Sequence, residues 1–160
     1  MSPFDKAIAF TLAQEGGYSN DPNDSGGETN FGISKRAYPN EGIKGMTVER
    51  AAELYRRDYW DKAGCNFLPA PVAILLFDGA VNQGPVRVVR LLQAAVAVRQ
   101  DGVIGPDTLR AVEKFGIRNT LSALAGKRAL EYAIHPQVTL YGYGWFRRLA
   151  ACLQTALQPF

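Results

Sequence analysis

The sequence predicts a mainly α-helical domain with one small β-hairpin near its N-terminus, on three observations. Apolar residues recur with the period of a helix through most of the 160 residues. Residues 18–33 are instead dominated by turn-forming Asn, Asp, Ser and Gly, and the run 29–33 is typical of a hairpin strand. Apolar residues make up 47% of the chain and charged residues 21%, which is typical of a globular protein and not of a disordered one.

The first helix is expected to end with an acidic residue that faces inward. Phe4, Ile8 and Glu15 fall at i, i+4 and i+11, which places all three on one helix face. Gly16 and Gly17 follow, and glycine ends helices readily because it tolerates the left-handed conformation. We therefore expect a helix that stops at Glu15, directly before the turn-rich stretch.

Cap residues and prolines mark the later helices. Thr47 and Asn119 are expected N-caps, and Pro85 suits the first position of a helix. Pro136 should end the helix that precedes it. These signals predict helices over residues 47–59, 72–82, 86–98, 108–115, 119–135 and about 145–157.

The cysteines and the N-terminus indicate where the chain is made. Cys65 and Cys152 lie far apart and fit no metal spacing, so we expect two free buried thiols and a reducing compartment. Asp5 and Lys6 interrupt the first apolar stretch, which does not resemble a signal peptide, and no run reaches the roughly 18–20 apolar residues of a membrane span. We expect synthesis in the cytoplasm and a separate export route for any extracellular role.

Charge is unevenly distributed along the chain, whose net charge is +3. Residues 1–80 carry eight Lys and Arg against eleven Asp and Glu, whereas residues 81–160 carry ten against four. The basic half suggests an anionic partner such as an outer-membrane or wall surface, and the alternative is an ordinary solvated helix surface. The segment 145–160, with Arg147 and Arg148, is the expected contact with such a surface.

Glu15 is the most informative residue of the sequence. Its helix face directs it toward the core, and the C-terminal end of the helix dipole places partial negative charge beside it. Both effects disfavour the carboxylate and favour the protonated acid, which a glycosidase needs in order to protonate its leaving group. The alternative is that Glu15 extends to solvent, paired with an arginine.

Three carboxylates follow Glu15 within the turn-rich stretch: Asp21, Asp24 and Glu28. An inverting glycosidase needs a second carboxylate roughly 6.5–9.5 Å from its acid, to activate a water molecule. A hairpin that begins after Glu15 can bring Asp24 or Thr29 to that distance. We expect Asp21, which precedes a proline, to be a turn residue, and for Asp24 both interpretations stay open.

Several segments together resemble glycoside hydrolase family 108. They begin with Glu-Gly-Gly-Tyr at residues 15–18 and Asp-Pro-Asn-Asp-Ser-Gly-Gly-Glu-Thr-Asn-Phe-Gly-Ile at residues 21–33. The resemblance covers almost the whole chain, and the later segments that carry it are residues 55–60, 68–69, 77–84, 92–93, 101–108 and 144–148.

The resemblance implies a lysozyme-like N-acetylmuramidase, as found among phage endolysins and secretion-associated bacterial enzymes. Glu15 matches the family's catalytic glutamate, and Asp24 and Thr29 are similar to the Glu–Asp–Thr order of phage lysozymes, with one residue fewer between them. Residues 1–90 would form the catalytic part, and residues 91–160 a C-terminal helical part that resembles a peptidoglycan-binding region, packed with it as one globular unit. The substrate would be the β-1,4 bond between N-acetylmuramic acid and N-acetylglucosamine of peptidoglycan glycan strands. Such an enzyme would act as a monomer on the cell wall in the periplasm after holin- or secretion-assisted export, in bacterial cell lysis or wall remodelling.

Other polar and aromatic residues are expected to line a substrate cleft. Asp78 and Asn82 are polar residues one turn apart on an apolar helix, where they need either sugar groups or internal partners. Adjacent aromatic residues can stack on a pyranose, although one of the pair should belong to the core. The predicted substrate contacts are Tyr18, Glu28, Asn30, Tyr59, Trp60, Asp78, Asn82 and Gln83.

An aromatic segment near the C-terminus has two interpretations. Tyr141, Tyr143 and Trp145 alternate with glycines and are expected to form a loop, which either contacts the ligand or plugs a gap between helices.

Several other chemistries are disfavoured. His135 is the only histidine, and without a Cys or His nearby it is expected to cap a helix end and not to bind a metal. The sequence contains neither a nucleophile elbow nor a nucleotide-binding fingerprint, so we expect no metal, cofactor or nucleic acid. Two alternatives to hydrolysis remain: a lytic transglycosylase on the same substrate, and a non-catalytic peptidoglycan-binding module.

Overall fold

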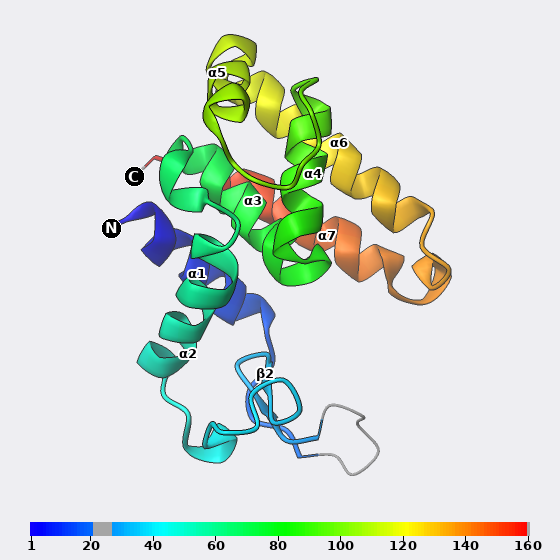
Figure 1. Ribbon diagram of the computed structural model, residues 1–160. Helices are drawn as coiled ribbons and strands as arrows, with labels where there is room; N and C mark the ends of the chain where they lie inside the picture. The colour runs from blue at the N-terminus through cyan, green and yellow to red at the C-terminus, as the bar shows by residue number, and fades with distance from the viewer. Residues whose placement is uncertain (21–26, 160) are drawn as a thin grey trace.

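The computed structural model describes residues 1–20 and 27–159, and over these residues the chain is mainly helical (Figure 1). A two-stranded antiparallel hairpin follows the first helix and pairs Thr29 with Ser34 and Asn30 with Ile33. The fold class expected from the sequence is therefore confirmed. In chain order the elements are α1 (Pro3–Gln14), β1 (Thr29–Asn30), β2 (Ile33–Ser34), α2 (Val48–Tyr55), α3 (Ala70–Gln83), α4 (Pro85–Ala95), α5 (Pro106–Phe115), α6 (Ile117–Ala133) and α7 (Val138–Leu157).

The first two helix starts follow directly from their cap residues. Ser2 and Asp5 form a capping box in which each side chain accepts a hydrogen bond from the other's backbone N–H. Thr47 Oγ1 accepts from the Arg50 N–H at 3.2 Å and starts α2, as predicted. A π-helical turn, Arg56–Asp61, continues α2 without a break.

Two predicted boundaries near the C-terminus are wrong. Asn119 lies inside α6, which begins at Ile117 after the left-handed Gly116. α7 begins at Val138, seven residues before the expected start, so Tyr141, Tyr143 and Trp145 are helical and form no loop. Glycine lowers helix propensity, but the packing of Trp145 on Tyr132 of α6, with ring centroids 5.6 Å apart, favours the helix here.

α3 is the central element of the core. Its residues from Val72 to Ala80 are all buried, and α1, α4, α6 and α7 pack around it. The ring of Phe77 lies 5.8 Å from Phe4 of α1 and 5.6 Å from Trp60. These edge-on aromatic contacts join the N-terminal helix and the segment after α2 to α3.

The two cysteines are free and buried, as expected. Burial raises the pKa of both the Cys65 and the Cys152 thiols. None of the described helices combines the length and the apolar character that a bilayer crossing requires.

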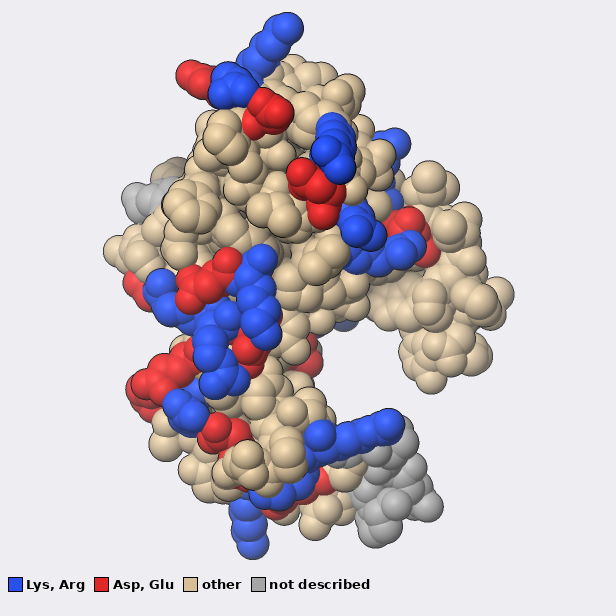
Figure 2. Space-filling model, in the orientation of Figure 1, with Lys and Arg blue, Asp and Glu red and all other residues tan. Residues whose placement is uncertain are grey.

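The molecule is hollowed between its hairpin end and the connection of α6 to α7, as Figure 2 shows. In Figure 1 the C-terminal end of α1 lies between these two parts. Glu15 directly follows α1 and therefore lies at this hollow.

Candidate active site

Glu15 caps the C-terminal end of α1. Its backbone N–H still donates to Thr11 O at 3.0 Å, but its φ of −78° and ψ of 146° are extended, so the helix stops at Glu15 itself. Gly16 and Gly17 do not adopt the left-handed conformation, so the mechanism expected for this helix end is wrong although its position is right. The side chain is 23% exposed, half-buried between core and solvent.

An ion pair holds the Glu15 carboxyl from one side. Arg148 of α7 donates from Nη1 to Glu15 Oε1 at 2.8 Å, and from Nε to Asp78 Oδ1 at 2.8 Å. The guanidinium thus bridges a half-buried carboxyl and a buried one. Its remaining nitrogen, Nη2, is buried and has no hydrogen-bond partner among the described residues.

Asp78 is the inner anchor of this bridge. It is 1% exposed, and its second oxygen, Oδ2, accepts from Arg128 Nη2 at 2.7 Å. Arg128 is itself fully buried and also donates to Leu75 O and to the Tyr132 hydroxyl. Burial alone would lower the pKa of Arg128, but the adjacent Asp78 carboxylate outweighs it and raises that pKa.

The same balance applies to Arg148. Burial opposes its charge, whereas the charge of Asp78 and the hydrogen bond to Glu15 support it, and the net effect raises the pKa of the guanidinium. Arg148 therefore remains a fixed cation between the two carboxyl groups.

The tip of the hairpin lies against the other side of the Glu15 carboxyl. Phe31 and Gly32 have φ values of 51° and 76°, which make the two-residue turn that suits a tight hairpin. Tyr55 of α2 donates from its hydroxyl to Phe31 O at 2.9 Å and holds this turn in place. A Cβ atom built on Gly32 would lie only 2.8 Å from Glu15 Oε2 and 2.6 Å from the Tyr55 hydroxyl oxygen, so only glycine fits.

The position of Tyr55 affects the pKa of its hydroxyl. Burial raises the pKa of its hydroxyl well above the usual range, and the neighbouring Glu15 charge adds to the shift. The Tyr55 hydroxyl therefore stays protonated and remains a hydrogen-bond donor.

The predicted partners of Glu15 lie in the hairpin region. Thr29 is in β1, where its backbone pairs with Ser19 by two hydrogen bonds of 2.8 and 2.9 Å. Asn30 and Ile33 are buried on one face of the ribbon, so Thr29 and Ser34 belong to the opposite face. Asp24, like Asp21, lies outside the described residues.

Three predicted substrate contacts are buried. Trp60 is 2% exposed and donates from Nε1 to Asn66 Oδ1 at 2.6 Å, so it is the core member of the Tyr59–Trp60 pair. Asn30 is 7% exposed and donates to Ile43 O at 3.2 Å. With Asp78 committed to two arginines, these three side chains stabilise the fold and do not face the hollow, which corrects the expectation of substrate contact.

The other predicted contacts are more accessible. Tyr18 is exposed and donates from its hydroxyl to Glu28 Oε1 at 2.9 Å, so these two form one unit at the hairpin. Tyr59 is partly buried, with its ring centroid 5.5 Å from that of Tyr55. Asn82 is exposed and donates to Asp78 O at 2.8 Å, a bond within α3 and not to the neighbouring helix or the Gly84 turn that the sequence left as an alternative.

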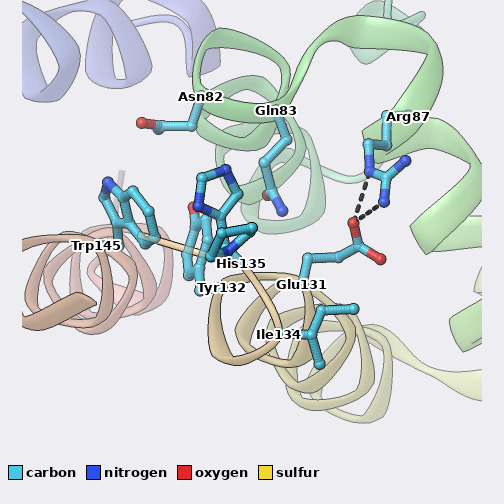
Figure 3. Close-up of a pocket in the computed structure, with 9 residues that line it drawn as sticks. Asn82, Gln83, Arg87, Glu131, Tyr132, Ile134, His135 and Trp145 are labelled. Atoms are coloured by element: carbon cyan, nitrogen blue, oxygen red, sulfur yellow. Dashed lines mark hydrogen bonds and ion pairs between the residues drawn. The ribbon is translucent and has the colours of Figure 1, made fainter. Parts of the chain in front are cut away.

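Asn82 and Gln83 border a cavity of about 420 Å³ between the end of α3 and the α6–α7 connection (Figure 3). Trp145, Tyr132 and His135 supply its aromatic side. Trp145 lies partly buried between these rings, so the aromatic segment both packs two helices together and lines a cavity.

The sequence prediction for Arg148 is wrong about where its side chain points. We expected it on an exposed basic segment facing an anionic surface, but it points inward to Glu15 and Asp78. Arg128 is also buried, where it pairs with Asp78 of the N-terminal half, so the basic excess of the C-terminal half is smaller at the surface than in the sequence. On the face shown in Figure 2, Lys and Arg are interspersed with Asp and Glu. Among the described residues, no group of three His, Cys, Asp or Glu side chains is arranged to hold a metal ion.

Comparison with known proteins agrees with this geometry. The sequence profile of glycosyl hydrolase 108 matches residues 8–84, which include Glu15, the hairpin and α3. The solved structure of Brucella abortus SagA is 35% identical and superposes with a TM-score of 0.85, over 96% of this chain and 93% of that chain. No curated protein matches at a significant level. The chain therefore belongs to glycosyl hydrolase family 108 and is a peptidoglycan hydrolase of the lysozyme type.

Proposed function

We propose that this enzyme hydrolyses the β-1,4 bond between N-acetylmuramic acid and N-acetylglucosamine, with Glu15 as the general acid. The observation that carries the proposal is the fixed position of the Glu15 carboxyl, held at 2.8 Å by Arg148 and enclosed by the hairpin tip at Gly32. A carboxyl with one oxygen anchored and the other facing the hairpin tip presents its proton in one direction. That geometry suits protonation of a glycosidic oxygen lying in the hollow.

The two carboxyl oxygens have separate tasks in this proposal. Oε1 accepts from Arg148 in both protonation states, and Oε2, on the side of Gly32, carries the transferable proton. A bound glycan excludes water from the half-buried carboxyl when the bond is to be broken. Once the proton is transferred and the leaving group departs, the positive charge of Arg148 stabilises the Glu15 carboxylate.

The water that attacks the sugar needs a positioning group on the hairpin side. Thr29, on the less buried face of the ribbon, and Asp24 are the two candidates, and both follow Glu15 within the matched region. In this proposal one of them orients the water on the sugar face opposite to the acid.

The test of the proposal is Glu15→Gln, which keeps an acceptor for Arg148 but removes the acid. We expect the release of reducing ends from purified peptidoglycan to fall by about 10²–10⁴-fold. Full activity of this variant would refute the role of Glu15, provided that its thermal unfolding matches that of the unchanged protein.

A lytic transglycosylase is the second candidate. It is favoured by one observation: among the described residues, the carboxyls of Asp78 and Glu28 are already bound to Arg128 and to Tyr18. A transglycosylase needs one acid and uses the muramyl 6-hydroxyl as nucleophile in place of water. Mass spectrometry of the products separates the two reactions, since anhydro-muramyl ends arise only from the transglycosylase.

A cell-lysis or wall-remodelling role, together with export to the periplasm, remains our proposal for the biological setting. The test compares cleavage of the cell wall by protein added outside the cells with cleavage by protein expressed in the cytoplasm. The comparison shows whether the protein needs an export partner.

A further inference from the structure

The cavity at the end of α3 lies directly beside the Glu15–Arg148–Asp78 bridge. Asn82 on its wall is one helical turn beyond Asp78, and Trp145 on the opposite wall is one turn before Arg148. A helical turn advances about 5 Å, so a group in the cavity lies next to a glycan whose scissile bond is at Glu15. The cavity is therefore placed to take part of the same substrate.

Its size exceeds the need of a single acetamido group. About 420 Å³ falls within the roughly 300–1,000 Å³ typical of sites for whole small ligands. The occupant should therefore be a substituent of several linked groups.

Two polar side chains of the cavity wall, Gln83 and His135, present hydrogen-bond donors. Gln83 Oε1 accepts from the buried Arg128 Nε at 2.9 Å, which turns the Gln83 amide N–H₂ away from Arg128; Figure 3 shows this side chain pointing into the cavity. His135 Nδ1 accepts from the Gln137 N–H at 3.2 Å, so the neutral ring carries its proton on Nε2. These two donors suit carbonyl and carboxylate oxygens of a ligand.

The rim of the cavity is charged. Arg87 and Glu131 form an ion pair there, with the Arg87 side chain 61% exposed and Glu131 22% exposed (Figure 3). The glycan backbone of peptidoglycan is uncharged, whereas its stem peptide carries carboxylates and the amine of a diamino acid. Opposite charges at one rim are complementary to such a peptide and offer nothing specific to a neutral sugar.

The aromatic wall also favours a peptide over a sugar ring. Trp145 is in contact with three rings, with centroids 5.0 Å from His135, 5.6 Å from Tyr132 and 5.9 Å from Tyr141. These neighbours occupy much of the indole surface on which a pyranose would stack. The exposed part can still pack against the aliphatic groups of a peptide.

We propose that this cavity binds the peptide stem of the muramic acid residue beside the bond that is cleaved. This inference rests on the proposed function, because it needs a muramyl residue positioned at Glu15. It makes the enzyme selective for stem-bearing glycan: the amide of Gln83 and the Nε2–H of His135 bind peptide oxygens, and Arg87 and Glu131 bind its charged groups.

The first experiment measures selectivity for the stem. The substrates are soluble, uncross-linked glycan strands that carry stem peptides, and the same strands after an amidase has removed the stems. We expect Arg87→Gln and His135→Ala each to reduce the ratio of kcat/KM on stem-bearing strands to kcat/KM on bare strands by about tenfold, the effect of losing one charge-assisted hydrogen bond. The matched control is Arg110→Gln, which removes an exposed Arg–Asp pair on α5 and should leave the ratio unchanged.

The outcomes of this experiment are distinct. Equal losses on both substrates would mean that the cavity takes an acetamido group of the glycan, which overturns the proposal. The proposal is also overturned if both variants keep the wild-type ratio. It is overturned as well if the wild-type protein itself does not prefer stem-bearing strands. If the wild-type protein releases reducing ends from neither substrate, the proposed function fails.

A binding measurement separates the two claims completely. In the Glu15→Gln protein, the fluorescence of Trp145 should respond to a synthetic stem pentapeptide with an N-terminal lactyl group and not to chitotriose. Trp145→Phe is the control, because the remaining tryptophan, Trp60, is buried away from the cavity. A response to chitotriose alone, or to neither probe, contradicts the proposal whatever the activity of the enzyme.

Discussion

Arg148 Nη1 lies 2.8 Å from Glu15 Oε1, although 133 residues separate the two in the chain. The first and the last helices thereby meet at the site through one ion pair, which is 15% exposed at Arg148 and 23% at Glu15. The end of α1 and the middle of α7 both pack beside α3, whose Asp78 anchors the same guanidinium. The position of the acid is thus a property of the whole helical core.

Replacement of Arg148 should impair catalysis more than stability. Arg148→Lys retains the charge, but a single ammonium group cannot hold Glu15 and Asp78 in the fixed fork geometry of a guanidinium. We expect kcat to fall by about 10–100-fold with a small change in KM, since the acid is misplaced while the glycan still binds. Steady-state kinetics on soluble glycan strands measure this split.

The control for this prediction is Arg148→Met, which removes both contacts. It should be less active than Arg148→Lys, so that activity follows how much of the bridge remains. Equal and full activity of the two variants would show that the bridge does not position Glu15.

Asp78→Asn should destabilise the fold. Its carboxylate is the shared partner of two guanidinium groups, those of the fully buried Arg128 and the partly buried Arg148, at 2.7 and 2.8 Å. Removal of one partner from a buried ion pair leaves an uncompensated charge and typically costs about 3–5 kcal/mol. Urea unfolding monitored by circular dichroism should give a loss in the free energy of unfolding of about this size.

Asp107→Asn is the matched control for Asp78→Asn. Asp107 pairs with Arg110 at the surface, where both side chains are largely exposed, so its loss should not change the midpoint of unfolding measurably. If the two variants are equally stable, the buried network contributes nothing to the fold.

The thiols should be unreactive in the folded protein. Burial raises the pKa of both Cys65 and Cys152, so at pH 8 each stays a thiol, and the thiolate that reacts with disulfide reagents is not formed. A chromogenic disulfide reagent should label neither cysteine in the native state and both after unfolding in guanidinium. Rapid labelling of the native protein would show that α3 and α7 separate readily at Cys152.

The helical architecture and the position of Glu15 at the end of α1 could be predicted from the sequence because both depend on local signals. The spacing of Phe4, Ile8 and Glu15 and the cap at Thr47 are local and specify their helices directly. The length of α7 was underestimated because its glycines have a low helix propensity. Packing against α6 outweighs that low propensity and cannot be read from the local sequence.

The partners of Glu15 could not be predicted in the same way. Arg148 is far away in sequence, and nothing in its local pattern separates an inward arginine from a solvated one. The same limitation applies to Trp60 and Asp78, whose burial depends on Phe4, Phe77 and Arg128 from other elements. Long-range packing decides which polar residues face the substrate.

Gly32→Ala should strongly reduce activity while the protein remains folded. The left-handed φ of 76° makes any side chain costly here, by about 1–2 kcal/mol. In addition, the new Cβ would lie 2.8 Å from Glu15 Oε2, closer than unbonded atoms approach, so the carboxyl must move out of its position. A displacement of this kind at the acid typically costs about 10²-fold in kcat/KM.

Gly27→Ala separates the two effects. Gly27 precedes the same hairpin and has a similar φ of 69°, but a Cβ there would meet nothing within 4 Å. It should therefore show the same loss of stability as Gly32→Ala in thermal unfolding and keep its activity. If both variants lose activity equally, strain in the hairpin and not intrusion on Glu15 is the cause, and the close approach of Gly32 to the acid has no catalytic role.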